Sequence, residues 1–473
     1  MNRMDTSWIS RTGARCFPAV EPVFLANDYG AAGDGVTLNT GAIQAAVDAA
    51  SASGGGKVTF APGTYLSGTI RLKNNVNLEL PKGTVLAGSE NPQDYPEIFT
   101  RHAGIELNTI APLILLDHCR CAAVTGHGII DGRGKRWWDL FWNRMLPEYE
   151  KKGLRWCVDY DCRRPKALVV QNSEDITVRD VTFHRSAHWT VHILYSSHVT
   201  AENIEIRNNI GGRGPSTDGF DIDSSEYIRV SRCLVSCNDD NFCLKSGRDA
   251  DGLRVNRPCR FVLIENCRAL SGSGLVTVGS ETSGGFDRIL VRDCSCRNTE
   301  VGIRFKSTSR RGGVIRNLFF EKIEMESPRI ALEMDLDWFP AYGSCILPPE
   351  FLNKPHPLHW DTLLTPVIPP ERGIPVLEKI FFRQIRAENA GTCCRISGSP
   401  VIQPRDLHFS EVFLQGFKGG SVTYAHAETV NGFFIQADEK PLFDHAPALE
   451  RGIDLVQMPR LAEMSCQTAN PSL

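Results

Sequence analysis

The sequence lacks several features that define common classes of protein. No run of about 18 apolar residues occurs in the 473-residue chain, which argues against a transmembrane helix. Neither sign of charge dominates, since 52 Lys and Arg stand against 55 Asp and Glu for a formal net charge of −3. This balance does not predict a nucleic-acid or membrane partner. The first twenty residues lack the uninterrupted apolar core of a secretory signal, so we expect no signal peptide and a cytoplasmic location.

What the sequence does contain is a repeat. Eight segments share an alternating pattern of apolar and polar residues, and they begin at Ile176, Val199, Ile228, Val262, Ile289, Leu318, Ile380 and Leu407. Their starts lie 23 to 34 residues apart, except for one step of 62 that we interpret as two coils. Alternation within a segment is typical of a strand, and self-similarity at this spacing is typical of a solenoid. The repeat predicts an all-β fold, a right-handed single-stranded parallel β-helix.

The cysteines fit this repeat. None of the sixteen forms a CxxC pair with zinc-ligand spacing. Cys233, Cys267 and Cys294 occupy one position of successive repeats, which Val or Ile fills elsewhere. A position shared by these residue types faces a core, where free Cys behaves as a small hydrophobe. We therefore predict stacked unpaired thiols, which suit a reducing compartment, and we predict no metal or other cofactor.

Three aspartates carry the clearest chemical signal. Asp218 lies in STDGFD, and Asp239 and Asp240 lie in NDDN, so that 22 residues separate Asp218 from Asp240. This is about one coil, which would bring the carboxylates together on strands about 4.8 Å apart. Such a cluster suits general acid/base hydrolysis of a glycosidic bond. Because neighbouring strand residues point to opposite faces, Asp239 and Asp240 require a bulge or turn.

Four ordered blocks resemble glycoside hydrolase family 28, the polygalacturonase family. They are STDGFD, NDDNFCLKSG, GSGLVTVGSETSGG and GIRFKS, which correspond to the Asn-Thr-Asp, Asp-Asp, Gly-His-Gly and Arg-x-Lys blocks of that family. The resemblance spans roughly residues 25–440, and KSGRDADG and SETSGG resemble a bacterial exo-acting branch. It implies hydrolysis of α-1,4 galacturonosyl linkages in pectic oligosaccharides with inversion and, by the branch, exo action. By the same resemblance Asp239 is the general acid, and Asp218 and Asp240 hold and activate the water.

The resemblance also implies residues that bind the substrate. Arg304 and Lys306 share a strand face about two coils beyond Asp240 and would bind a galacturonate carboxylate, which Arg can do through two parallel hydrogen bonds. His192 resembles a cleft histidine of the exo branch. Ser273 stands where the family has His, and a hydroxyl can hydrogen-bond but cannot carry a proton at neutral pH. Ser216 similarly replaces an Asn.

The organisation predicted along the chain has three parts. Residues 1–22 form a loose arm, 23–450 a parallel β-helix catalytic domain, and 451–473 a C-terminal tail. A helix at about 39–53 covers the open end of the solenoid, because exposed strand edges need covering. The Pro- and aromatic-rich stretch at about 338–375 is a loop beside the cleft and a candidate wall that closes one end. KSGRDADG, near Gly247, is expected to add a second wall.

Other functions stay open at this point. One is hydrolysis of rhamnogalacturonan or of another decorated uronate, because Ser273 replaces the family histidine. Another is a calcium-dependent, pectate-lyase-like enzyme that takes its oxygen ligands from Asp218, Asp221, Asp223, Asp239 and Asp240. A third is a non-catalytic carbohydrate-binding β-helix. In each case the expected partner is an acidic oligosaccharide, and the sequence leaves the oligomeric state open.

Overall fold

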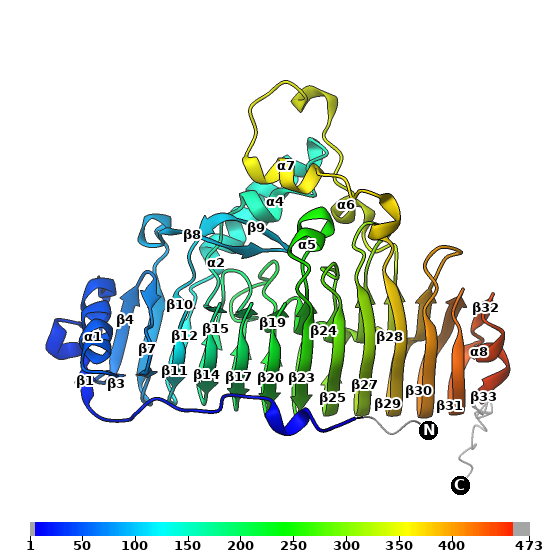
Figure 1. Ribbon diagram of the computed structural model, residues 1–473, viewed down its shortest axis with the longest axis horizontal. Coiled ribbons are helices and arrows are strands. Elements are labelled where there is room, and N and C mark those ends of the chain that lie inside the picture. The colour runs from blue at the N-terminus through cyan, green and yellow to red at the C-terminus, as the bar shows by residue number, and fades with distance from the viewer. Residues whose placement is uncertain (1–4, 457–473) are drawn as a thin grey trace, which may run out of the picture.

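A computed structural model describes residues 5–456 of the chain. Within this range 31 strands pair as one continuous parallel sheet, which winds into a right-handed β-helix (Figure 1). The cleft-bearing face consists of β10 (Ile114–Asp117), β13 (Leu168–Gln171), β16 (Val191–Leu194), β19 (Phe220–Asp223), β22 (Asp240–Lys245), β24 (Arg268–Val278), β26 (Thr299–Lys306) and β28 (Ile330–Asp335).

Two further faces complete each coil. The second consists of β11 (Arg120–Thr125), β14 (Glu174–Arg179), β17 (Ser197–Glu202), β20 (Glu226–Ser231), β23 (Cys259–Glu265), β25 (Phe286–Arg297), β27 (Val314–Glu326), β29 (Val376–Ser397) and β30 (Arg405–Thr423). The third begins with β12 (Ile129–Asp131), β15 (Thr182–His184), β18 (Glu205–Arg207) and β21 (Leu234–Ser236). The first coils use β1 (Val23–Leu25), β2 (Asp34–Leu38), β3 (Gly56–Thr59), β4 (Gly63–Ser67), β5 (Ile70–Arg71), β6 (Val76–Glu79) and β7 (Thr84–Gly88), and the last use β31 (Ala427–Glu439), β32 (Leu442–Asp444) and β33 (Ile453–Val456).

The repeated segments of the sequence are strands of the second face, and they pair with one another in register. Each of its eight starting residues pairs directly with the next, from Ile176 opposite Val199 to Ile380 opposite Leu407. The fold prediction is thus confirmed. Our interpretation of the 62-residue step was wrong, because Leu318 pairs directly with Ile380. That step is a single coil, lengthened by the 338–375 insertion.

The predicted cysteine stack is confirmed. Cys233, Cys267 and Cys294 are at most 3% exposed, and Cys294 pairs in register with Ile323 of the next coil. All fifteen cysteines within residues 5–456 are free thiols. Aromatic side chains stack inside the coils in the same way, as Phe220 does on Phe242 with ring centroids 5.4 Å apart.

The ends of the solenoid are covered. Helix α1 (Thr40–Ala52) packs its apolar face, which includes Ile43 and Val47, onto the first coils (Figure 1). At the other end lies α8 (Pro447–Gly452), followed by β33. The prediction of a tail from residue 451 was wrong as far as 456, because these residues pair with β31. Residues 457–473 lie outside the described range.

The N-terminal arm is not loose, which corrects that prediction. From residue 5 to 22 it runs as a strap along the outside of the coils toward α1 (Figure 1). Trp8 is 3% exposed and packs on Leu263 and Leu290. Arg15 donates to the Asp175 carboxylate at 2.8 Å. An apolar ring and a paired guanidinium hold the strap in place, while residues 1–4 lie outside the described range.

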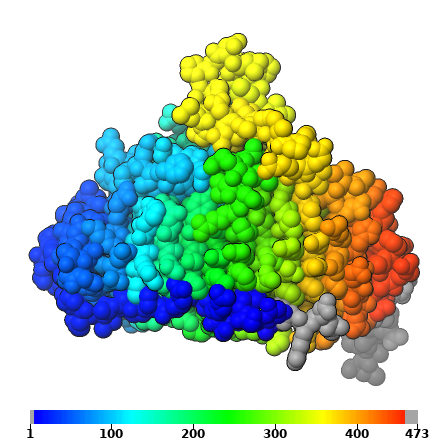
Figure 2. All heavy atoms as spheres, viewed as in Figure 1, coloured from blue at the N-terminus to red at the C-terminus, as the bar shows by residue number. Residues whose placement is uncertain are grey.

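Three insertions rise from the cleft-bearing side (Figures 1 and 2). The first is the antiparallel hairpin of β8 (Glu97–His102) and β9 (Ile105–Ile110). The second contains α2 (Lys135–Leu140), α3 (Leu146–Lys151) and α4 (Val158–Asp161), and the third, at 338–375, contains α6 (Pro340–Gly343) and α7 (Leu358–Leu364). No helix in residues 5–456 is long and apolar enough to cross a membrane.

Candidate active site

A cavity of about 240 Å³ lies between the cleft-bearing face and the insertions. Six of the predicted site residues line it: Asp218, Asp239, Asp240, Ser273, Arg304 and Lys306. The range typical of drug-sized ligands is about 300–1,000 Å³. The cavity is smaller than this range.

The three aspartates converge as their spacing predicted. Asp240 is the first residue of β22, and Asp239 lies on the bend just before it, so the required turn is present. The Gly219 N–H donates to the Asp240 carbonyl at 2.9 Å, which places Asp218 beside Asp240 across one coil. Carboxylate oxygens of these two residues lie within 4.8 Å of each other. Asp239 is only half-buried, whereas Asp218 and Asp240 are at most 3% exposed.

The environment separates the pKa values of the adjacent pair. Burial and the neighbouring Asp240 raise the pKa of Asp239. Burial would also raise the pKa of Asp240, but Lys306, Arg304 and other cations outweigh it and lower that pKa to about 2. The Lys306 ammonium lies 2.6 Å from an Asp240 oxygen. Asp239 therefore tends to hold a proton while Asp240 is ionised.

A buried carboxylate layer continues beneath them. Burial, then Asp221 and Asp239, raise the pKa of Asp218 well above its usual range. Burial raises the pKa of Asp221 to about 8. Three buried or partly buried carboxyl groups, Asp218, Asp221 and Asp239, therefore have raised pKa values.

Arg304 and Lys306 stand on the cavity wall from β26, two coils beyond Asp240, as predicted. Arg304 Nε lies 2.8 Å from Glu333 Oε2, and Glu333 also contacts Arg395 on the next coil. These three residues are direct register partners on β26, β28 and β29. Glu333 is fully buried, so it fixes the direction in which Arg304 projects.

Sequence reasoning missed two ionised groups in the cavity. Lys245 Nζ lies 3.2 Å from Glu281, 3.5 Å from Asp221 and 3.9 Å from Asp218. Both Lys245 and Glu281 line the cavity. The position of Lys245 could have been predicted. It lies two residues after Cys243 on β22, and alternate residues of a strand share a face, so both side chains point outward from the coil. Glu281 lies in a loop, within the SETSGG block noted above, but no periodicity indicated which residue of that block would face the cavity.

His192 does not occupy the place we predicted. Its side chain is fully buried below the cavity and is not part of the lining. Its Nδ1 lies 2.9 Å from Lys166 Nζ, and its Nε2 lies 3.5 Å from an Asp223 oxygen. Burial, then Lys166, lowers its pKa to about 3. His192 thus supports the cavity floor through other residues and does not reach a substrate.

Residues from all three insertions also line the cavity. Arg155 and Asp159 come from the α2–α4 insertion, and Ala103 from the turn of the β8–β9 hairpin. The 338–375 insertion supplies Trp338, Phe339 and Tyr342. These three residues lie beside the cavity, and Lys306 Nζ lies 4.7 Å from the centre of the Trp338 ring.

A cation could find ligands in this cavity only in competition with the protein's own cations. Asp218, Asp240 and Cys243 offer atoms within 4.8 Å of one another. However, the Lys306 ammonium already lies against Asp240. Asp223, another of the ligands considered above for calcium, is paired with Arg101 at 2.8 Å. The donor set therefore favours fixed lysine and arginine charges over a bound metal.

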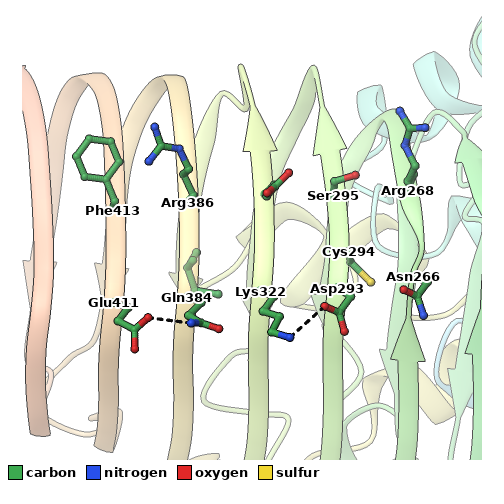
Figure 3. Close-up of a pocket in the computed structure, with 12 residues that line it drawn as sticks. Asn266, Arg268, Asp293, Cys294, Ser295, Lys322, Gln384, Arg386, Glu411 and Phe413 are labelled. Atoms are coloured by element: carbon green, nitrogen blue, oxygen red, sulfur yellow. Dashed lines mark hydrogen bonds and ion pairs between the residues drawn. The ribbon is translucent and has the colours of Figure 1, made fainter.

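A second hollow lies on the outer surface of the coils (Figure 3). Its charges neutralise one another, since Lys322 lies 3.7 Å from Asp293 and Gln384 donates to Glu411 at 2.8 Å. Its charged side chains are exposed to solvent. Hollows lined by exposed and mutually paired groups offer little to a ligand, so the chemistry lies in the smaller cavity.

Comparison with known proteins agrees with the geometry. The model of glycosyl hydrolases family 28 matches residues 100–349. This chain belongs to that family. As a member of family 28 it is a glycosidase. A second model, described as rhamnogalacturonase A/epimerase, pectate lyase-like, matches residues 24–98, which form the first coils.

Individual family 28 relatives cover most of the chain. A probable polygalacturonase of Vitis vinifera is 30% identical over 383 residues, which are 79% of this chain and 70% of the relative. An exo-poly-alpha-D-galacturonosidase of Dickeya chrysanthemi is 28% identical over 68% of this chain and 58% of its own length. The crystal structure of a hyperthermoactive exopolygalacturonase from Thermotoga maritima superposes with a TM-score of 0.75 at 24% identity, covering 96% of both chains. At that identity the likeness concerns the fold.

Proposed function

We propose that this protein is a polygalacturonase that removes single galacturonate units from the end of pectic oligosaccharides, with inversion. The observation that carries the proposal is the cavity itself. Asp218, Asp239 and Asp240, whose pKa values contrast, line it together with Arg304, Lys306 and residues of the three insertions. The two polygalacturonase relatives named above support the choice of substrate.

Asp239 acts as the general acid. A general acid must hold a proton at the working pH, and burial and the neighbouring Asp240 raise the pKa of Asp239 in the direction that favours its protonated form. Asp239 is also the most accessible of the three aspartates. It donates its proton to the glycosidic oxygen as the bond to the leaving sugar breaks.

Asp240 and Asp218 hold the attacking water. Asp240 is ionised over the whole physiological range because its pKa is lowered to about 2, and it accepts the proton of the water. The raised pKa of Asp218 favours its protonated form, in which it donates a hydrogen bond to the water and orients it. Inversion requires that water attack the face of the sugar opposite the leaving oxygen.

Arg304 and Lys306 recognise the sugar acid. A guanidinium and an ammonium on one strand face complement a carboxylate, and burial strengthens that attraction. Lys306 also holds Asp240 ionised, so the same side chain serves binding and catalysis. A neutral sugar would leave these charges without a partner.

We infer that the insertions close one end of the cavity, and this closure favours exo action. Ala103, Arg155 and Tyr342, one from each insertion, line the cavity of about 240 Å³ together with the aspartates. A substrate therefore enters with its terminal residue first, and each cleavage releases a monomer. An open groove would accept the middle of a chain instead.

The test is a digestion of oligogalacturonates of defined length, with products resolved by size from the first time points and by anomer with NMR. We expect galacturonate monomer as the main early product, formed with inverted configuration. A mixed ladder of oligomers would contradict exo action, and retained configuration would contradict the roles of Asp218 and Asp240.

A lyase is the second candidate, because a pectate-lyase-like model matches residues 24–98. β-Elimination leaves a double bond that absorbs in the ultraviolet, whereas hydrolysis does not. An ultraviolet-absorbing product that depends on added calcium would favour the lyase. We expect none, because Lys245, Lys306 and Arg101 already pair with the carboxylates in question.

A further inference from the structure

Arg248 contacts all three insertions that close the cavity, although it does not line the cavity itself. It follows β22 in the KSGRDADG segment, just before α5 (Asp249–Val255), and its side chain is fully buried. A buried guanidinium carries five donors that must find acceptors, so its partners indicate what it holds together.

Arg248 has partners in all three insertions, besides its neighbour Asp249, which lies 3.4 Å from Nε. The Arg248 backbone N–H donates to the Gly104 carbonyl of the β8–β9 turn at 2.8 Å. Nη1 donates to the Tyr160 hydroxyl of α4 at 3.0 Å, and Nη2 donates to the Tyr342 carbonyl of α6 at 2.7 Å. Nη2 also lies 3.2 Å from Cys345 Sγ.

The contacts continue into the cavity lining. The Arg248 guanidinium lies 4.5 Å from the centre of the Tyr342 ring, and Tyr342 is part of the wall. The Tyr160 hydroxyl donates onward to the Ala103 carbonyl at 2.7 Å, and Ala103 is also part of the wall. The side chain of Arg248 thus binds α4 and α6 directly and reaches the β8–β9 turn through the Tyr160 hydroxyl.

We infer that Arg248 is the positioning residue that keeps the end of the cavity closed and thereby sets the exo mode of attack. The inference rests on the proposed function and adds the residue that determines it. Without Arg248, the Tyr342 carbonyl and the Tyr160 hydroxyl lose their shared donor, and the walls separate. A longer substrate can then pass the closed end.

The test compares the unmodified protein with Arg248→Met and with Tyr160→Phe. Tyr160→Phe removes only the hydroxyl that joins Arg248 to Ala103 and keeps the ring. Arg329→Met is the matched control, because Arg329 is an exposed arginine that is paired with Glu300 and does not line the cavity. Each protein digests a long galacturonate oligomer and a dimer, and hydrogen exchange follows residues 338–364.

In Arg248→Met we expect longer oligomers among the earliest products and faster exchange at 338–364. We expect kcat/KM on the dimer to fall about 10- to 100-fold, since misplacement by about 1 Å has effects of this size. In Tyr160→Phe the product sizes, the exchange rates and kcat/KM should change in the same direction but by smaller amounts. In Arg329→Met all three should equal those of the unmodified protein. A merely structural role would lower stability without changing the size of the products.

Pure monomer release by folded Arg248→Met and by Tyr160→Phe would overturn the inference and leave the proposed function intact. If Arg248→Met does not fold, the products of Tyr160→Phe decide the question. A mixed ladder from the unmodified protein would overturn exo action itself and the inference with it.

Discussion

The coils and the insertions of this protein are held together in different ways. In the coils, the inward-facing residues of a strand meet apolar residues one coil away, as Leu318 meets Ile380 and Cys294 meets Ile323. The insertions share a single apolar cluster that includes Trp156 and Trp360, and individual polar side chains join them further. Asp161 accepts from Tyr149 at 2.9 Å and from Trp360 at 3.0 Å, and it lies 2.6 Å from His359 Nε2.

This difference indicates where a substitution matters. A core position of the coils has equivalents along the whole stack, so its contribution is shared. A joint such as Asp161 or Arg248 has no equivalent, because each insertion occurs once. Conservative changes in the core of the coils beneath the active site should therefore have small effects on stability. Single changes in the insertions that cover the active site should have large effects.

The largest effect is expected where the two regions meet, at the bend before β22. Asp239→Asn should lower kcat by about 100- to 10,000-fold, because an amide cannot give the glycosidic oxygen the proton it needs. The unfolding temperature should stay close to that of the unmodified protein. Asp293→Asn, on the outer hollow of Figure 3, is the control. Near-normal turnover of Asp239→Asn would show that Asp239 is not the general acid.

The next largest effect concerns Arg304 and the residue that holds it. Arg304→Ala should lower kcat/KM on oligogalacturonates by about 10- to 100-fold, since charge-assisted hydrogen bonds contribute about 1.5–3 kcal/mol. Glu333→Gln should act in the same direction by a smaller factor, mainly through a higher KM. In the double variant the second change should add almost nothing.

Additive effects of Arg304→Ala and Glu333→Gln would show that Glu333 acts elsewhere. Glu300→Gln serves as the control, because Glu300 is also paired with an arginine but lies at the surface. The kcat and KM of Glu300→Gln should equal those of the unmodified protein.

A moderate effect on stability is expected from the buried carboxyl group of Asp221. Its folded pKa, about 8, is higher than the usual unfolded value, so the folded state binds the proton more tightly. The stability that this group contributes is present at low pH and is lost as the pH rises toward about 8. One proton changes the free energy of unfolding by at most about 1.4 kcal/mol per pH unit.

Asp221→Asn should therefore lose less stability than the unmodified protein between pH values of about 6.5 and 8.5. Thermal unfolding of both proteins across this range measures the difference. Parallel curves would mean that Asp221 does not retain its proton in the folded protein.

The smallest effect is expected in the coils. Cys267→Val should change the free energy of unfolding by less than about 1.5 kcal/mol, because Val and Ile fill the same position in other coils. Chemical denaturation measures this change. A loss of several kcal/mol would show that the stacked thiols have a specific role and would weaken the contrast between coils and insertions.

The same contrast explains how far the sequence predicted the structure. The coil register and the convergence of Asp218, Asp239 and Asp240 followed from spacing, because a solenoid turns a fixed separation in sequence into a neighbour in space. The 62-residue step was misread because a pattern of strand starts cannot distinguish a missing repeat from an insertion. The strap at residues 5–22 was missed because it has no repeat of its own.

The part of the cavity lining that comes from the insertions was predictable only in part. The unusual composition of 338–375 indicated a wall, but not which side chains would face the substrate. Arg155 and Asp159 come from an insertion whose fold depends on contacts made once, such as the Asp159 pair with Arg164. His192 was misplaced because a histidine on a strand gives no sign of whether its face is covered.

The direct pairing of Leu318 with Ile380 has a consequence for how such enzymes can change. Lengthening a flexible connection from about 27 to about 62 residues adds only about 0.7 kcal/mol of closure entropy, because this term grows with the logarithm of length. A coil can therefore carry a long insertion and still close on its neighbours. The insertions that cover the active site can be exchanged, enlarged or shortened while the solenoid beneath them keeps its shape. New substrate ranges can therefore arise without a new fold.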